Sequence, residues 1–142
     1  LYEVGTTKDV ELEGGKTRRY IAVDGGMSDN IRPGLYGAKY SALLANRTSS
    51  ATGINSRLVG KHCESGDIII REIDLPSDIA PGDILAIPAT GAYGRSMASN
   101  YNHMLKPAVI SVVNGAARTI LRRETEADLL ALDVVEAPRT IK

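Results

Sequence analysis

Phenylalanine and tryptophan are both absent from this chain of 142 residues, which has six tyrosines instead. A hydrophobic core without these two residues must be built from valine, isoleucine, leucine and alanine. A chain of this length can bury one such core, so we expect a single domain, residues 1–142. The tyrosine hydroxyls can serve ligands or interfaces.

Net charge is also absent, because 17 basic residues balance 17 acidic ones. The chain therefore has no global field that would favour nucleic acid or an anionic membrane as a partner. No apolar run approaches the ~20 residues that span a bilayer. The first five residues lack an initiator methionine, a basic region and an apolar region, so they do not form a signal peptide. They resemble the start of a strand, and we expect the chain to be cut from a longer protein or processed.

Cysteine occurs once, as Cys63. One cysteine excludes an intrachain disulfide framework and a cysteine-based zinc cluster. It is consistent with a reducing compartment, so we expect a cytoplasmic location. The two histidines, His62 and His103, lack the spacing and the acidic neighbours of a metal site, so we expect no metal.

Short β-type runs between glycine and proline turns dominate the sequence. Residues 10–13 alternate apolar and charged side chains, and a glycine pair separates them from the β-rich run 18–23. This pattern predicts a hairpin. Asn114-Gly115, between residues 108–113 and 116–123, is a stronger hairpin signal. Further strand candidates are residues 41–45, 57–59, 68–70 and 84–87.

Helical signals are few. Thr125 is the predicted N-cap of a short C-terminal helix, with Leu129, Leu130 and Leu132 as its apolar face. Residues 96–102 are a second candidate. Six to eight short strands with one or two short helices predict a mainly β fold, an antiparallel β-sandwich or barrel-like domain.

Three glycine-rich loops have side chains able to bind a ligand. The longest of them, residues 25–40, has a length that is often functional, and none of the three has a phosphate-loop or dinucleotide pattern. Taken singly, each has a plainer interpretation: turn glycines, a solvated arginine, tyrosines that cap the core, or a buried thiol. The loops are residues 24–40 with Arg32 and Tyr36, residues 60–67 with Cys63 and Glu64, and residues 90–102 with Tyr93.

Taken together and in this order, the motifs resemble the C-terminal domain of the diaminopimelate decarboxylase family. These are pyridoxal-phosphate enzymes of fold type III. The resemblance covers essentially the whole chain and is weakest at residues 49–55. It depends on residues 23–27 (VDGGM), 29–33 (DNIRP), 35–36 (LY), 60–67 (GKHCESGD), 88–93 (PATGAY) and 122–125 (RRET).

The resemblance implies more than the residues themselves establish. Such enzymes have an N-terminal (β/α)8 barrel that binds pyridoxal 5'-phosphate and a C-terminal β domain that completes the site. They act as homodimers whose active sites combine both subunits. In lysine biosynthesis they remove carbon dioxide from the D-configured centre of meso-diaminopimelate and release L-lysine. The implied partners are thus the barrel domain, a second copy of the chain and a small-molecule amino acid.

The resemblance also implies roles for individual residues. Arg32 and Tyr36 would contact the substrate, with the Arg32 guanidinium on a carboxylate. Cys63 would be the proton donor, acting in the partner subunit's site, and Glu64 would bind a substrate ammonium. Tyr93 would contact both cofactor and substrate. This agrees with the chemistry, because a thiol beside a carboxylate is disposed to act as an acid rather than as a nucleophile.

The Schiff-base lysine and the phosphate-binding glycines of the family lie in the barrel, so we predict that this chain alone is inactive. None of its own lysines has the sequence context of the cofactor lysine: Lys8, Lys16, Lys39, Lys61, Lys106 and Lys142. Two alternatives stay open. One is a related decarboxylase acting on ornithine, arginine or carboxynorspermidine, against which Glu64 and Arg32 argue. The other is a non-catalytic β module used for dimerisation.

Overall fold

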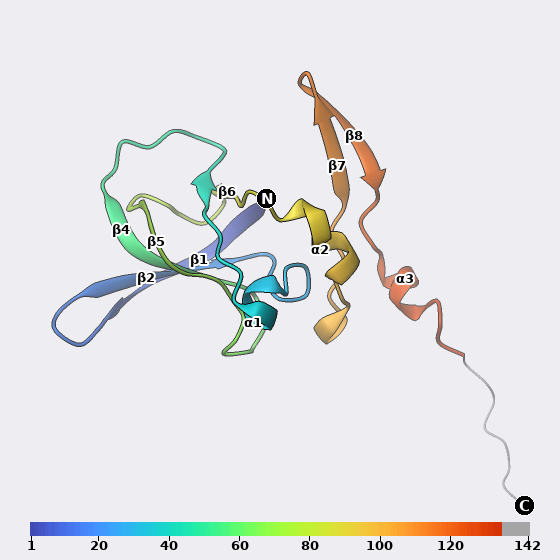
Figure 1. Cartoon of the computed structure of the whole chain (residues 1–142), viewed down its shortest axis with the longest axis horizontal. Coiled ribbons are helices and arrows are strands. Elements are labelled where there is room, and N and C mark those ends of the chain that lie inside the picture. Colours follow the sequence, from blue (N-terminus) through green and yellow to red (C-terminus); the bar gives the residue numbers. More distant parts are fainter. Residues whose placement is uncertain (135–142) are drawn as a thin grey trace, which may run out of the picture. The chain divides into compact units, whose positions relative to one another are not determined.

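The computed structural model describes residues 1–134, which fall into two compact units (Figure 1). The first unit is Leu1–Ser99, and the second begins at Asn100. Within the described residues, no helix is long and apolar enough to cross a membrane. The same residues contain no group of three or more histidine, cysteine or acidic side chains that could hold a metal ion.

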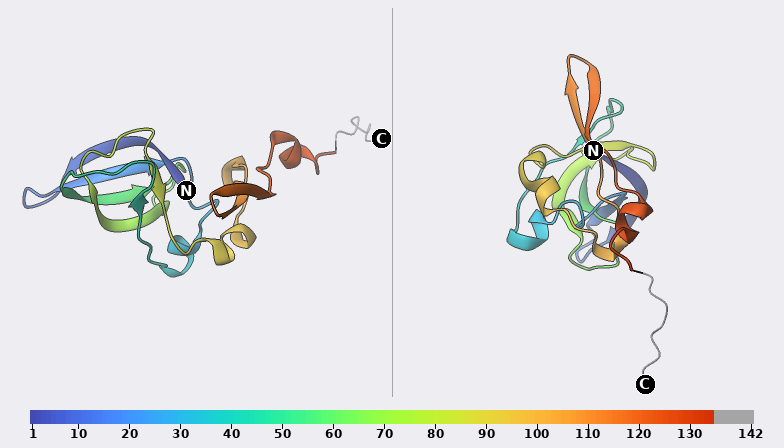
Figure 2. Two further views of the ribbon diagram at one scale, coloured as in Figure 1. Left: turned by 90° about the horizontal axis from the view of Figure 1, so that it is seen from above. Right: turned by 90° about the vertical axis from the view of Figure 1, so that its right-hand side faces the viewer.

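The first unit is built on a six-stranded sheet in the order β3-β6-β1-β2-β4-β5, which curls into a nearly closed barrel (Figure 2). The mainly β, barrel-like fold is therefore confirmed. The strands are β1 (Tyr2–Glu11), β2 (Thr17–Val23), β3 (Leu43–Leu44), β4 (Gly53–Val59), β5 (Ile68–Pro76) and β6 (Ile84–Ala86).

One strand pair departs from the antiparallel arrangement that the sequence predicts. β2 and β4 run parallel, from the pair Arg19–Ser56 to the pair Ala22–Val59. Parallel neighbours need a long crossover connection, and here residues 24–52 supply it. The crossover includes α1 (Arg32–Tyr36) and β3. The predicted hairpin of β1 and β2 is present, with Glu11 opposite Thr17.

The core lies inside the barrel and has the composition that the sequence predicts. Ile21, Leu58 and Leu85 are fully buried, and among residues 1–134 Tyr2 is the one buried aromatic member, with the partly buried Tyr40 packed against the core. Because no phenylalanine or tryptophan is available, many small branched side chains fill the interior. The buried apolar residues of the core are Tyr2, Val4, Ile21, Val23, Ala42, Leu58, Ile69, Ile70, Leu75, Ile79, Leu85 and Ile87.

The described residues contain three short α-helices, one more than the upper expectation. α1 has Pro33 in its first turn, where a missing N–H costs nothing, and ends at Gly37, whose φ of 70° is left-handed. α2 spans Gly91–Met97, and a 3₁₀ turn, η1, spans Tyr101–His103. The helix predicted at residues 96–102 therefore begins five residues earlier and stops at Met97.

The second unit contains the hairpin predicted at Asn114-Gly115. β7 (Val109–Val113) and β8 (Ala116–Leu121) flank the two turn residues, whose φ angles of 50° and 77° are both positive. Positive φ at both positions defines the type I′ turn that matches the twist of the strands.

α3 (Glu126–Leu130) follows the hairpin and begins as predicted, at Thr125. The side chains of Thr125 and Asp128 form a capping box. The predicted apolar face is wrong in one member, because Leu132 lies beyond the end of the helix and is 91% exposed.

Candidate active site

Three tyrosines surround Arg32 at the start of α1. The Arg32 guanidinium carbon lies 5.6 Å from the ring centres of Tyr36 and Tyr40 and 5.9 Å from that of Tyr93. Its Nε donates to the Tyr36 hydroxyl, four residues later on the same helix, and its Nη1 donates to the Ala89 carbonyl at 3.3 Å. Helix geometry explains the first contact, since residues i and i+4 share a face.

The environment keeps Arg32 charged and accessible. The hydrogen bond with Tyr36 holds the pKa of the guanidinium above its usual range. Arg32 is half-buried, whereas Tyr36 and Tyr93 remain 55% and 60% exposed. Tyrosine rings attract a cation through their faces and so restrict its movement. A planar cation held in this way is suited to bind a carboxylate.

The backbone at Ala89 is strained. Its φ of 59° lies in the left-handed region, which costs an alanine about 1–2 kcal/mol. This left-handed conformation turns the chain between β6 and α2, and the Ala89 carbonyl then faces Arg32. Such strain often accompanies functional sites, where the surrounding structure holds it in place.

Cys63 and Glu64 lie on the loop of residues 60–67 between β4 and β5, and both are exposed. The interpretation of Cys63 as a buried thiol is therefore wrong. The loop is closed by its own backbone: Gly60 N–H donates to the Asp67 carbonyl at 2.9 Å, and Asp67 N–H donates to the Glu64 carbonyl at 3.0 Å.

The Asp67 carboxylate connects this loop to the loop before α1. Asp67 is 3% exposed, and its Oδ1 accepts from Met27 N–H at 2.7 Å while its Oδ2 accepts from His62 N–H at 2.8 Å. Two glycines make room for it. A Cβ at Gly60 would lie 2.5 Å from Asp67 Cγ, and one at Gly26 would lie 2.6 Å from Oδ2.

Two further hydrogen bonds join the same loops. Lys61 N–H donates to the Gly25 carbonyl at 3.0 Å. The buried side chains of His62 and Ser28 are 2.9 Å apart, from Nε2 to Oγ. The 60–67 loop also lies beside α1, because a Cβ at Gly34 would be 3.9 Å from the Gly66 carbonyl.

The carboxylate of Asp29 links the loop before α1 to Tyr2 at the start of β1. Its carboxylate accepts from the Tyr2 hydroxyl and from Gly26 N–H, the latter at 2.7 Å. Burial raises the pKa of Asp29 and, more strongly, that of Tyr2. Gly25 is required by this packing, since a Cβ there would overlap the Tyr2 ring and lie 2.6 Å from its Cδ1.

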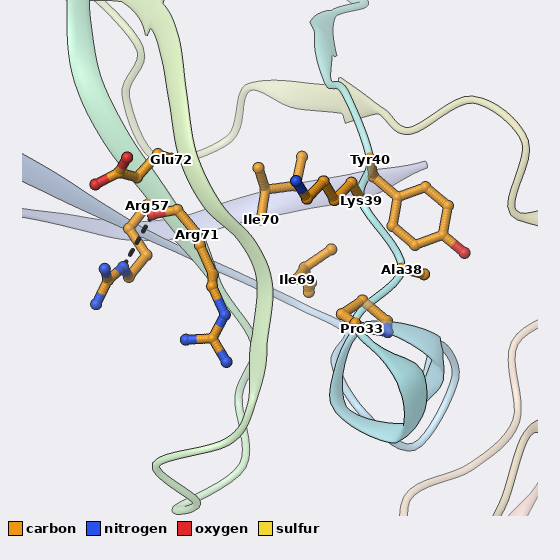
Figure 3. A pocket seen from close by; sticks show the side chains of 10 residues that line it. Pro33, Ala38, Lys39, Tyr40, Arg57, Ile69, Ile70, Arg71 and Glu72 are labelled. Carbon is orange, nitrogen blue, oxygen red and sulfur yellow. Dashed lines mark hydrogen bonds between the residues drawn. The ribbon is translucent and has the colours of Figure 1, made fainter.

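A groove of about 500 Å³ lies beside α1, with Pro33 and Tyr40 in its lining (Figure 3). Tyr40 lines it on the side of the α1–β3 connection, and Arg57, Arg71 and Glu72 line it on the side of β4 and β5. Arg57 Nε donates to the Arg71 carbonyl at 3.0 Å, and Glu72 pairs with Arg18 at 2.6 Å. We place the candidate site at Arg32, because three of the five predicted site residues meet there and none of the five lines the groove.

The RRET motif of the second unit has structural contacts. Glu124 Oε2 accepts from Asn100 Nδ2 at 2.6 Å and from Lys106 N–H at 2.9 Å. Arg122 pairs with Asp128 at 2.6 Å, and this hydrogen bond holds the pKa of that carboxyl well below its usual range. The Glu124 contacts tie the chain after β8 to the segment before β7, and the Arg122–Asp128 pair ties it to α3.

The structure thus brings together three of the five predicted site residues, Arg32, Tyr36 and Tyr93. The other two, Cys63 and Glu64, share an exposed loop that is hydrogen-bonded to the segment before α1. Sequence reasoning missed Tyr40 and Asp67. The only available signal for Asp67 was its place at the end of the CESGD motif.

Comparison with known proteins gives a consistent result. The family model described as "Pyridoxal-dependent decarboxylase, C-terminal sheet domain" matches residues 1–91. Diaminopimelate decarboxylase of Mycobacterium tuberculosis is 58% identical over 134 residues, which are 94% of this chain and 30% of that protein. The Bacillus subtilis enzyme is 52% identical, with 94% of this chain and 29% of that protein covered.

A solved structure extends the likeness to three dimensions. Diaminopimelate decarboxylase of Helicobacter pylori, crystallised with L-lysine, superposes with a TM-score of 0.79 at 36% identity, covering 93% of this chain and 30% of that one. The chain thus spans about a third of the length of its relatives. It belongs to the pyridoxal-dependent decarboxylase family, in which it corresponds to the C-terminal sheet domain.

Proposed function

We propose that residues 1–142 are the C-terminal domain of a homodimeric diaminopimelate decarboxylase, a pyridoxal-phosphate enzyme of lysine biosynthesis. The parent protein converts meso-2,6-diaminopimelate to L-lysine and carbon dioxide. The observation that supports this most is the charged Arg32 framed by three tyrosines, in a chain 58% identical to a diaminopimelate decarboxylase. A substrate with amino-acid groups at both ends needs a cation for its second carboxylate.

Arg32 and Tyr36 bind that carboxylate. The guanidinium fork matches two carboxylate oxygens, and the Tyr36 hydroxyl on Arg32 Nε fixes the plane of the fork. Glu64, on the same loop as Cys63, binds a substrate ammonium. Simple diamine-forming substrates such as ornithine have no second carboxylate for Arg32, which favours diaminopimelate over the related substrates.

Cys63 supplies the proton that replaces carbon dioxide. As the carbon–carboxylate bond breaks, its electrons remain on the substrate, and the same carbon then takes the proton from Cys63 Sγ. The exposure of Cys63 fits this role, because the thiol must reach the partner subunit's site. General-acid catalysis of this kind contributes about 10²–10⁴-fold in rate.

The residues present fit one side of a pyridoxal-phosphate site. Tyr93 offers an exposed ring and hydroxyl beside Arg32. Asn30 Nδ2 and Arg95 Nε are buried without a hydrogen-bond partner in residues 1–134, which is consistent with acceptors supplied from outside this chain. When bound, the cofactor withdraws the electrons left by the carboxylate. We infer that its Schiff-base lysine lies in the barrel domain.

The test uses the full-length protein, with carbon dioxide and L-lysine measured from meso-diaminopimelate, ornithine and arginine. We expect turnover of diaminopimelate alone. Arg32→Lys should raise KM for diaminopimelate about 10–100-fold, because a single ammonium cannot replace the two-pronged fork. Turnover of ornithine or arginine, unaffected by Arg32→Lys, would contradict the proposal.

The isolated chain provides a separate test. Without the barrel it should not turn over diaminopimelate, and adding pyridoxal phosphate should produce no Schiff-base absorbance band. A stoichiometric band that survives removal of free pyridoxal phosphate would contradict the absence of a cofactor lysine from residues 1–142.

A further inference from the structure

Asp67 has no part in the proposed chemistry, yet its buried carboxylate lies between the two loops that contribute to the site. Each of its oxygens accepts one backbone N–H, from Met27 at 2.7 Å and from His62 at 2.8 Å. Met27 lies five residues before Arg32, and His62 is bonded directly to Cys63. One side chain therefore fixes the path of the Cys63 loop relative to the segment before α1.

The Asp67 carboxylate lies in a cradle formed by Gly26, Gly60 and its two backbone donors, and this cradle leaves the carboxylate little freedom to move. Both acceptor contacts are to backbone, which cannot rotate away as a flexible side chain can. Gly26 and Gly60 enclose the carboxylate so closely that neither position has room for a Cβ. A buried acceptor that loses its donors pays the full cost of desolvation, so the two loops are held in this arrangement.

The His62–Ser28 hydrogen bond is an independent second link. Both side chains are buried, at 8% and 5% exposure, and their atoms are 2.9 Å apart. This bond joins the residue before Cys63 to the residue after Met27. Movement of either loop would break both links together.

We propose that the Asp67 carboxylate, assisted by the His62–Ser28 bond, is a positioning group that fixes the loop of Cys63 and Glu64 against the segment before α1 and so places both side chains for the partner subunit's site. This inference rests on the proposed function, in which Cys63 protonates the substrate in the partner subunit's site. A shift of about 1 Å in such a group costs about 100-fold in rate. Asp67 thus acts through Cys63 and does not contact substrate.

The test compares Asp67→Asn with Asp83→Asn in the full-length enzyme. Asp83 is a matched control, since its carboxylate is also buried (6% exposed) and accepts four hydrogen bonds, but its partners are Arg47, Asn46 and Ala80. Asp67→Asn places an amide N–H₂ against a backbone N–H. We expect kcat to fall at least tenfold for Asp67→Asn and to stay unchanged for Asp83→Asn.

The decisive measurement is the configuration of deuterium in L-lysine formed in D₂O. A fold defect alone lowers the amount of active enzyme but leaves the configuration single. A displaced Cys63 lets solvent deliver the label to both faces, so Asp67→Asn should yield a mixture, as should Cys63→Ala. Asp83→Asn should keep a single configuration.

The outcomes separate the two claims. If Cys63→Ala left turnover and configuration unchanged, the proton-donor role would fail and this inference with it. If Cys63→Ala changed both while Asp67→Asn changed neither, only the positioning role would be overturned. Should Asp67→Asn not fold, Ser28→Ala cuts the second link more gently; a single configuration with unchanged kcat there would also overturn it.

Discussion

The two buried carboxylates, Asp67 and Asp83, hold two loops of the barrel in different ways. Asp83 is held mainly by one cation: Arg47 donates from Nε and from Nη2, each at 2.8 Å. These hydrogen bonds hold the pKa of Asp83 well below its usual range. Asp67 instead accepts from backbone N–H groups in both loops of the candidate site.

The kind of donor, side chain or backbone, decides whether each carboxylate mainly stabilises the fold or also positions a loop. A long arginine side chain can follow its partner when a loop shifts, so the Asp83 pair tolerates small displacements. Backbone donors move only with the chain itself, so the Asp67 contacts transmit any displacement to Cys63. We infer that the Arg47–Asp83 pair serves mainly to stabilise the barrel. The contacts of Asp67 also fix the position of the Cys63 loop.

The largest expected effect comes from filling the Asp67 cradle. Gly60→Ala would place a Cβ 2.5 Å from Asp67 Cγ and push the carboxylate off its backbone donors. We expect the free energy of unfolding to fall by about 3 kcal/mol, from overpacking and lost hydrogen bonds. Urea denaturation measures it.

Gly66→Ala is the matched control for Gly60→Ala. It lies on the same loop, and a Cβ there meets nothing within 4 Å. Its effect should be within about 0.5 kcal/mol, as for ordinary surface substitutions. Equal losses for the two variants would mean that the loop, rather than the cradle, is sensitive to any side chain.

The second prediction concerns a substitution that removes the main hydrogen-bond donor of Asp83. Arg47→Met leaves the Asp83 carboxylate buried without its main donor and should lower the free energy of unfolding by about 2 kcal/mol at neutral pH. Because the folded pKa of Asp83 is lowered, the pair stabilises fully above the ordinary carboxyl value of 3.8 and is lost as pH falls through the folded value.

The pH dependence is therefore the internal control for Arg47→Met. Thermal unfolding from pH 3 to pH 8 should show a constant deficit above about pH 5 that narrows in acid. A deficit that stays the same at pH 3 would assign the loss to the methylene stem of Arg47 instead of its charge.

The third prediction concerns Asp29, a carboxyl whose pKa is raised by folding, whereas that of Asp83 is lowered. Burial raises the pKa of Asp29, and the hydrogen bond from Tyr2 partly opposes this rise. Tyr2→Phe removes the opposing bond and should cost about 1 kcal/mol at neutral pH. The pKa of Asp29 should rise further, since its charged form loses a donor.

The sign of the pH effect distinguishes Asp29 from Asp83. A carboxyl with a raised folded pKa stabilises the fold less as pH increases through that value. The Tyr2→Phe deficit should thus be greatest at neutral pH and least in acid, where Asp29 is protonated. An NMR titration of Asp29 Cγ that shows no upward shift would refute this account.

Local chemistry explains why much of the fold could be predicted from sequence. Both hairpins follow from their own turn residues, Gly14-Gly15 and Asn114-Gly115. The parallel β2–β4 pair could not be predicted, because it depends on how the 29-residue crossover, residues 24–52, returns to the sheet. Propensity and turn signals do not encode that path.

The site shows the same limit. Motif resemblance selected Arg32, Tyr36 and Tyr93, and these lie together. The burial of Asp67 could not be read from the sequence, because an aspartate after glycine usually marks an exposed turn. Its desolvation depends on Met27, which is 40 residues away along the chain.

The smallest expected effect tests the second link between the two loops. Ser28→Ala removes one buried hydrogen bond to His62 and should lower the free energy of unfolding by only about 0.5–1 kcal/mol. Ser65→Ala, an exposed change on the 60–67 loop, should have no measurable effect. The informative measurement is amide hydrogen exchange at Cys63 and Glu64, because a loop with fewer anchors opens more often. Faster exchange confined to residues 60–67 would assign the bond to placement of that loop, whereas faster exchange across β4 and β5 would make it a general support of the barrel.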